Sequence, residues 1–180
     1  MGNIFSKTLF KKGEYHMSKY IILYRHGMAV EKADAPDDDL RSLSARGKRL
    51  LKKSVSGFKI MLGKKDNVVI YSSPKLRARE TAEMLSAELE LENPEFLDFL
   101  GTGGNVRHLR QIVEDIEPGT VAIIVGQQPF LSIWSQEISG IFLPFKKGTA
   151  ACFKFPDEGE TKAELRWYLQ TRDFIKIDEK

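Results

Sequence analysis

The amino-acid sequence predicts a single α/β domain over residues 17–180, with a mainly parallel sheet, helices on both of its faces and an antiparallel hairpin at one edge. Short runs of branched apolar residues alternate with longer amphipathic segments, which is typical of βαβ units. Several of these runs are apolar throughout, as strands covered on both faces are. The 180 residues suit one domain with a sizeable core.

Six runs are expected to form strands. The runs 19–24 and 120–126 are apolar enough to be interpreted as strands buried on both faces. In 163–169 apolar and polar residues alternate, which indicates a half-exposed edge strand that pairs with 148–155 as a hairpin. The remaining two strands are expected at 67–71 and 95–100.

Helix-start signals place four helices between these strands. Ser44 is expected to cap the first helix. Ser73 as an N-cap, followed by Pro74 at the first helical position, starts the second. The other two are expected after Asn105 and from 129 to 139.

The composition excludes several classes of function. The net charge of +3 is too small to indicate a nucleic-acid-binding protein, and no apolar run approaches the length that spans a membrane. Cys152 lies in an apolar run and is expected to be an inert core thiol, which fits a reducing cytoplasm. His16, His26 and His108 show no metal-ligand spacing. We therefore expect a cytoplasmic protein without a metal or another cofactor.

The first 16 residues have two interpretations. Residues 1–6 match the N-myristoylation pattern, and the lysines behind them would favour an anionic membrane. Alternatively, translation begins at Met17, because residues 12–16 can be back-translated into a ribosome-binding sequence just ahead of that codon. Residues 1–16 are then a leader, and otherwise a disordered extension. We favour Met17, since a strand is expected two residues later, and expect membrane contact only with the Met1 start.

Polar side chains follow three of the predicted strands. Arg25 and His26 end the first strand, Arg77 falls in the first turn of the helix after the second, and Gln127 follows the strand at 120–126. Ligands of such sheets lie at the carboxyl ends of the strands, and a glycine directly after His26 leaves room there for a substrate. The sequence therefore predicts a ligand site at this edge.

Two arginines and a histidine at a helix N-terminus indicate a phosphate site. The histidine could attack phosphorus and carry the phosphoryl group while the arginines neutralise its charge, with no need for a metal. The alternative that the residues leave open is a strand-end Arg and His that merely cap a surface. The acidic run 31–39 is expected to be a solvated loop, and His108 to be a surface residue.

These residues resemble the motifs of the histidine phosphatase superfamily, which has a three-layer phosphoglycerate-mutase-like fold. Its Arg-His-Gly signature corresponds to Arg25-His26-Gly27, and its second element is similar to residues 73–82. Residues 41–47 and 125–132 resemble segments of the SixA-type phosphohistidine phosphatases, the smallest bacterial branch. The similarity covers residues 19–155.

The resemblance implies that His26 is the phosphorylated nucleophile, that Arg25 and Arg77 bind phosphate, that Gly27 lines the substrate site and that Arg41 contacts substrate from its loop. The chain is too short for the helical insertion that covers the pocket of the sugar-phosphate mutases. An open pocket would suit a phosphorylated protein, such as a histidine-phosphorylated signalling protein, or a small phosphorylated substrate. No nucleic-acid partner is implied.

Two positions depart from the family pattern. Gln127 stands where the family has a second histidine; its amide can donate a hydrogen bond but is neutral, and the loss could cost roughly 10²–10³-fold in rate. Asp98 is a weak candidate for the acid that protonates the leaving group. Two hypotheses follow: a metal-independent phosphatase, most plausibly for protein phosphohistidine, or a degenerate member that binds a phosphorylated partner without efficient turnover.

Overall fold

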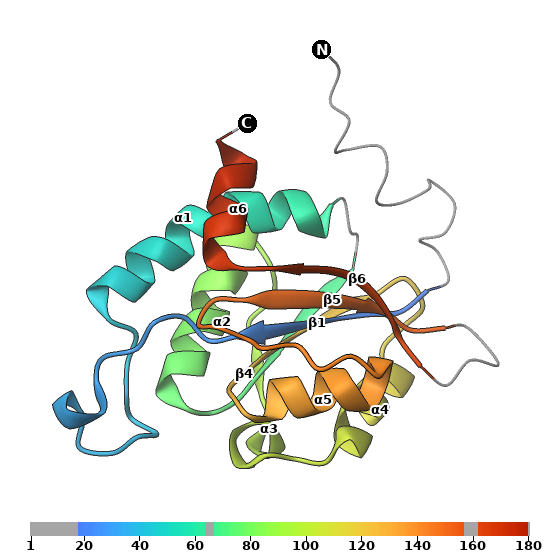
Figure 1. Ribbon diagram of the computed structural model, residues 1–180, viewed down its shortest axis with the longest axis horizontal. Coiled ribbons are helices and arrows are strands. Elements are labelled where there is room, and N and C mark those ends of the chain that lie inside the picture. The colour runs from blue at the N-terminus through green and yellow to red at the C-terminus, as the bar shows by residue number, and fades with distance from the viewer. Residues whose placement is uncertain (1–17, 64–66, 157–161, 180) are drawn as a thin grey trace.

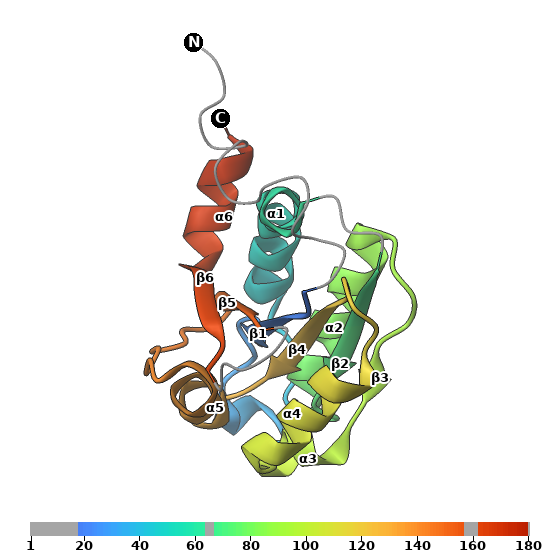
Figure 2. The same cartoon turned by 90° about the vertical axis from the view of Figure 1, so that its right-hand side faces the viewer.

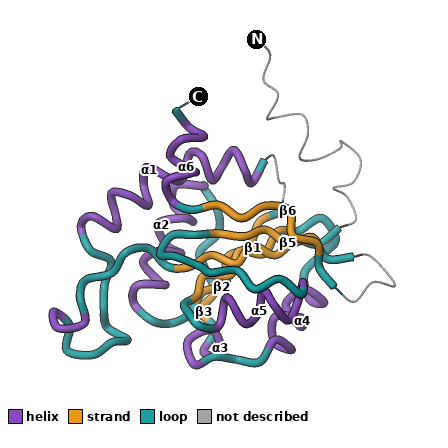
Figure 3. The backbone as a smooth tube through the Cα atoms, in the orientation of Figure 1, coloured by secondary structure: helices purple, strands orange, loops and turns teal. Residues whose placement is uncertain are grey.

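The computed structural model describes residues 18–63, 67–156 and 162–179, and within them one sheet of six strands carries helices on both faces (Figures 1 and 3). The strands are β1 (Tyr20–Arg25), β2 (Val68–Ser72), β3 (Glu95–Phe96), β4 (Val121–Gly126), β5 (Ala150–Lys154) and β6 (Glu164–Leu169). The helices are α1 (Ala45–Leu62), α2 (Leu76–Leu89), α3 (Asp98–Thr102), α4 (Val106–Asp115), α5 (Phe130–Ser139) and α6 (Thr171–Asp178), with a 3-10 turn η1 (Lys32–Asp34).

The sheet confirms the predicted α/β class. Its strand order is β3-β2-β4-β1-β5-β6. The pairs β2–β3, β2–β4 and β1–β4 are parallel, whereas β5 runs antiparallel to β1 and forms the antiparallel edge pair with β6. The two central strands are β1 and β4, which the sequence predicts to be buried on both faces. They are parallel neighbours, so their carboxyl ends meet at one edge of the sheet.

The two faces of the sheet carry separate cores, which makes the three-layer arrangement that Figure 2 shows from the side. Alternate residues of β1 point to opposite faces. Tyr20, Ile22 and Tyr24 join the core under α1, α2 and α6, whereas Ile21 and Leu23 join the core over α3, α4 and α5. All five are buried. Both faces of β1 are covered, so its apolar run is continuous.

The prediction of a strand over 95–100 is wrong beyond Phe96. The edge strand pairs only at Glu95 and Phe96, and the chain then turns into α3. An edge strand has a partner on one side only, so continuing it gains few hydrogen bonds. Folding into a helical turn instead buries Leu100 completely under the sheet, and Gly103 ends this turn in the left-handed conformation at φ 84°.

Two helix predictions also need correction. The second helix begins at Leu76 with Lys75 as its N-cap residue, so Ser73 and Pro74 belong to the loop before it. The C-terminal helix α6 was not predicted, although a signal for it exists. The Gln170 side chain accepts from the N3 backbone and the Asp173 carboxylate accepts from the Gln170 N–H, which is a capping-box arrangement. The caps at Ser44 and Asn105 are confirmed.

Four further expectations concern single residues, membrane spans and the N-terminal segment. Cys152 is buried, as predicted for a core residue. His108 is exposed. Among the described residues no helix has both the length and the apolar character needed to cross a bilayer. The predicted leader or extension, residues 1–16, and the start at Met17 lie outside the described residues.

Helix α6 packs directly against α1 through a glycine. A Cβ atom added at Gly57 would lie 1.8 Å from the backbone oxygen of Phe174, so only glycine permits this approach. The ring of Phe174, which is fully buried, meets Phe58 edge-on at 5.5 Å between centroids. The close approach of the α1 and α6 backbones therefore allows α6 to cover this side of the core.

We expect Gly57→Ala to lower the free energy of unfolding by about 2 kcal/mol, because the methyl group forces α6 away from α1. Urea denaturation would measure this, with Ser56→Ala as the control, since Ser56 is exposed on the same helix. Equal stability of the two variants would show that α6 does not depend on this contact.

Candidate active site

The carboxyl ends of β1, β2 and β4 bring the predicted site residues together. Arg25 pairs with Gly126 in the parallel register, and the backbone N–H of His26 donates to the Gly126 oxygen at 3.0 Å. Gln127 follows directly, so it lies beside His26. On the other side of β4, the N–H of Ser73 donates to the backbone of that strand. The predicted meeting of three strand ends is confirmed.

His26 is held as a neutral imidazole by hydrogen bonds at both ring nitrogens, and Nε2 is the one without a proton. Its Nδ1 lies 2.7 Å from the backbone oxygen of Gly27, an acceptor, so Nδ1 carries the proton. The Nε–H of Arg77 points at Nε2 from 3.2 Å, where the ring has its lone pair. The ring is 5% exposed. This arrangement presents Nε2 as the nucleophilic atom.

The surroundings of His26 keep it unprotonated. Burial is the largest influence and, with the charges of Arg77, Arg25 and Lys147, lowers the pKa of His26 from 6.5 to about 3, although its bond to the Gly27 oxygen acts in the opposite direction. A neutral imidazole keeps the lone pair that attack on phosphorus requires. At neutral pH Nε2 is therefore unprotonated without the help of a separate base.

Arg25 contributes an unused donor to the same place. Its Nη1 donates to the Phe145 backbone oxygen at 2.7 Å, while its Nε is buried and has no hydrogen-bond partner among the described residues. Burial and then the charge of Arg77 lower the pKa of Arg25. A buried N–H without an acceptor is costly, and an anion would satisfy it. Arg25 is thus poised to bind a phosphoryl oxygen.

Arg77 is the most enclosed cation of the site, at 6% exposure. Its Nη1 donates to the backbone oxygen of Asp38, and its Nη2 pairs with the Asp38 carboxylate at 3.0 Å. The expectation that the run 31–39 is a solvated loop is wrong for Asp38, which is half-buried, although its neighbours Asp37 and Asp39 are exposed. The acidic loop therefore folds onto the site because Arg77 attracts its carboxylate.

Arg41 and Asp98 lie further out. Arg41 directs Nε and Nη2 to the Val30 oxygen, at 3.0 and 2.7 Å, and Nη1 to Asp38, at 3.0 Å, so its guanidinium braces the loop. Asp98 is exposed at the start of α3, and among the described residues its carboxylate makes no hydrogen bond or ion pair with His26. A substrate contact for Arg41 and an acid role for Asp98 stay predictions.

The side-chain amide nitrogen of Gln127 donates to the protein backbone and is not available to donate to a substrate. Its Nε2 donates to the backbone oxygens of Leu100 at 2.6 Å and Gly101 at 3.3 Å, which uses both N–H bonds. Its Oε1 is buried and has no partner among the described residues. The expected donation to phosphate is thus not available in this conformation, because α3 takes the donors; the side chain has only an acceptor to spare.

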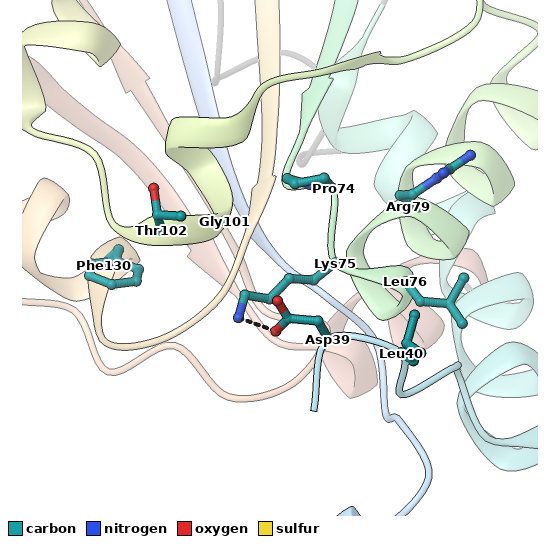
Figure 4. A pocket seen from close by; sticks show the side chains of 9 residues that line it. All are labelled: Asp39, Leu40, Pro74, Lys75, Leu76, Arg79, Gly101, Thr102 and Phe130. Atoms are coloured by element: carbon teal, nitrogen blue, oxygen red, sulfur yellow. Dashed lines mark hydrogen bonds and ion pairs between the residues drawn. The ribbon is translucent and has the colours of Figure 1, made fainter. Parts of the chain in front are cut away.

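A pocket of about 600 Å³ adjoins this cluster (Figure 4). In the view of Figure 4 the Lys75 ammonium meets Asp39, with Phe130 and Thr102 to one side and Leu40 to the other. Part of its wall directly follows Asp38 in the chain and part directly precedes Arg77, but neither His26 nor Arg77 itself lines the pocket. It is lined by Asp39, Leu40, Pro74, Lys75, Leu76, Arg79, Gly101, Thr102 and Phe130.

Several solved structures share this fold. The protein histidine phosphatase SixA, solved with tungstate, superposes with a TM-score of 0.72 at 20% identity, over 86% of this chain and 98% of its own. Phosphoglycerate mutase from Bacillus anthracis gives 0.66 at 11% identity, over 94% and 100%. A phosphoserine phosphatase mutant from Entamoeba histolytica gives 0.63 at 13% identity, over 86% and 98%. This chain therefore shares the fold of these phosphatases and of the mutase.

A curated relative defines the family more narrowly. An uncharacterized protein of Picosynechococcus is 31% identical over 121 residues, which span 66% of this chain and 72% of the relative. This chain belongs to the same protein family as that cyanobacterial protein. No family model matches the sequence.

Three residues of the site were not predicted. Asp38 lies in an acidic run, and nothing in the sequence distinguishes it from its exposed neighbours Asp37 and Asp39. Thr81 is fully buried; its Oγ1 accepts from the Gly27 N–H at 3.0 Å and donates to the Arg77 oxygen at 2.7 Å, which ties the two motifs together. Lys147 is exposed in a pair of lysines, and only the tertiary structure shows that its charge reaches His26.

The low pKa of His26 makes stability depend on pH. An unfolded chain binds a proton on this ring below about pH 6.5, whereas the folded protein does so only near pH 3, so stability is lost as the pH falls between these values. We expect His26→Asn to remove roughly 2 kcal/mol of the stability lost by the parent between pH 7 and 4.5. Denaturant unfolding at both pH values would show it, with His108→Ala keeping the parent's loss. An unchanged loss in His26→Asn would contradict a neutral His26.

Lys147 adds an unpaired positive charge, because no described carboxylate forms an ion pair with it. We expect Lys147→Ala to weaken the binding of inorganic phosphate by roughly three- to ten-fold at low salt, and less at high salt, since the side chain is exposed and screened. Calorimetric titration would measure the affinity, with Lys146→Ala as the matched control. Equal losses in both variants would mean that only the net charge matters.

Proposed function

We propose that this protein is a metal-independent phosphatase that transfers a phosphoryl group to His26 and then to water. The observation that carries the proposal is the unprotonated Nε2 of His26, which burial keeps neutral and which accepts a hydrogen bond from the Arg77 Nε–H at 3.2 Å. The unpartnered Nε–H of Arg25 supplies a second donor beside it. A neutral nucleophile between two guanidinium groups suits an anionic phosphoryl group.

In the first step Arg77 redirects its Nε–H from Nε2 to a phosphoryl oxygen, which releases the lone pair of Nε2. Nε2 then forms a bond to phosphorus, and the bond between phosphorus and the leaving group breaks with its electron pair going to the leaving group. The proton on Nδ1 stays in its bond to the Gly27 oxygen, so that carbonyl faces the positive charge that develops on the ring. In the second step a water oxygen bonds to phosphorus, the P–Nε2 bond breaks, and the pair returns to Nε2. One water proton leaves with phosphate or solvent. The arginines face the phosphoryl oxygens in both steps.

Phosphohistidine in a protein is the substrate that we favour. Imidazole leaves more readily than an alkoxide, so the exposed position of Asp98 is less of a handicap for an N–P bond than for an O–P bond. The adjoining pocket is open and bordered by exposed Leu40, which leaves room for a bulky partner. SixA, which has this fold, is a protein histidine phosphatase. A cytoplasmic location is part of the same proposal.

The alternative, a binding protein without turnover, receives no support from the comparisons, since the named structures of this fold are phosphatases and mutases. Gln127 affects the expected rate of phosphoryl transfer and not the class of protein that we propose. Its amide adds no charge to the site and its N–H groups hold α3. We therefore propose a slow enzyme.

We expect protein that begins at Met17 to release phosphate from a histidine-phosphorylated protein faster than from an aryl phosphate. His26→Ala should abolish turnover of both, and Gln127→His should raise it by up to roughly 10²-fold, because an imidazolium adds a charged donor. His108→Ala, at an exposed position, is the control and should match the parent. Phosphate release and acid-labile phosphoenzyme would be measured together. Activity that survives His26→Ala, or none in the parent and in Gln127→His alike, would refute the proposal.

A further inference from the structure

The guanidinium group of Arg77 is bound along two different edges. Its outer edge, formed by Nη1 and Nη2, meets the backbone oxygen and the carboxylate of Asp38. Its inner edge, which includes Nε, faces His26 Nε2 at 3.2 Å. A planar guanidinium can serve two acceptors in this way, because its five N–H bonds diverge in one plane. Asp38 and a phosphoryl group on His26 would thus use separate edges.

The Asp38 carboxylate is itself fixed from a second side. Its Oδ1 accepts from Arg41 Nη1 at 3.0 Å while its Oδ2 faces Arg77 at 3.0 Å. Arg41 in turn donates to the backbone oxygen of Val30. The hydrogen bond from Arg41, and then the charge of Arg77, lower the pKa of Asp38. The carboxylate is therefore anchored to the loop and holds one orientation against Arg77.

We propose that Asp38 is a positioning residue for phosphoryl transfer, which clamps the outer edge of Arg77 so that its Nε–H stays aimed at the phosphoryl group on His26. This inference rests on the proposed phosphatase function. Without the clamp, a long side chain on the first turn of α2 gains rotamer freedom and can turn its outer edge to phosphate instead. Misplacement of this kind is costly for the transition state even where ground-state binding is kept.

The clamp also offsets charge. Arg25, Arg77 and Lys147 surround His26, and Asp38 is the carboxylate that pairs with Arg77. Removing that negative charge should strengthen the attraction for free phosphate while turnover falls. A loss of rate with tighter product binding is a combination that simple unfolding does not produce.

The test compares Asp38→Asn with Asp37→Asn in the full chain. Both changes remove one charge from the same loop without changing its size, but the Asp37 side chain contacts the backbone of Asp39 and not Arg77. The Arg77 Nε–H resonance, assigned by its loss in Arg77→Lys, reports the clamp by NMR. Turnover of a histidine-phosphorylated protein and inhibition by inorganic phosphate report its consequence.

We expect Asp38→Asn to broaden or lose the Arg77 Nε–H resonance, to lower kcat by roughly 10–100-fold, and to bind phosphate as tightly as the parent or more tightly. Asp37→Asn should stay within about two-fold of the parent in each. A retained resonance with unchanged kcat would overturn the proposal. So would a rise in kcat/KM, which would make Asp38 a competitor of phosphate, or an equal loss in Asp37→Asn.

The two proposals fail in different ways. If the parent releases no phosphate from any substrate, the phosphatase proposal fails, and the NMR comparison still decides whether Asp38 orients Arg77. If the parent is active through His26 and the Arg77 resonance is indifferent to Asp38→Asn, the phosphatase proposal stands and the positioning role is wrong.

Discussion

The contact between Arg77 Nε–H and His26 Nε2 is the interaction on which the rest of the candidate site depends. It joins residues 51 positions apart, one at the end of β1 and one in the first turn of α2. It exists only while the imidazole is neutral, because a protonated ring would offer no lone pair and would repel the guanidinium. Burial maintains that state, and the same burial prevents water from screening the arginines. Packing of the core thus prepares the nucleophile.

With its Nε–H directed at His26, Arg77 needs acceptors for the N–H groups of Nη1 and Nη2. The acidic loop supplies them, since Asp38 satisfies the outer edge of Arg77 and Arg41 holds Asp38. The Asp38 side chain is still 37% exposed, so water partly screens its ion pairs and limits what they add to stability. The network is better understood as a device for orientation, in which a loop with few apolar contacts is ordered by the guanidinium groups it serves.

Gln127 connects two elements at the edge of the sheet where the candidate site lies. Its amide donates to two backbone oxygens of α3, so the side chain joins β4 to the turn that follows β3. A neutral amide does this without the cost of burying a charge. The side chain is thus a neutral structural tie, and Lys147, from the loop before β5, contributes positive charge near the His26 imidazole.

The sequence by itself determined the α/β class, five of the six strands to within a few residues, four of the helices, and the meeting of Arg25, His26, Arg77 and Gln127. Apolar periodicity and cap residues are local signals, and parallel strands place their carboxyl ends at one edge whatever the details. Only the tertiary structure decided that 98–102 is helical, that Asp38 pairs with Arg77, and that the Gln127 donors face α3. Each of these features depends on a partner that is distant in the chain. The local pattern of residues does not determine the free energy of such contacts.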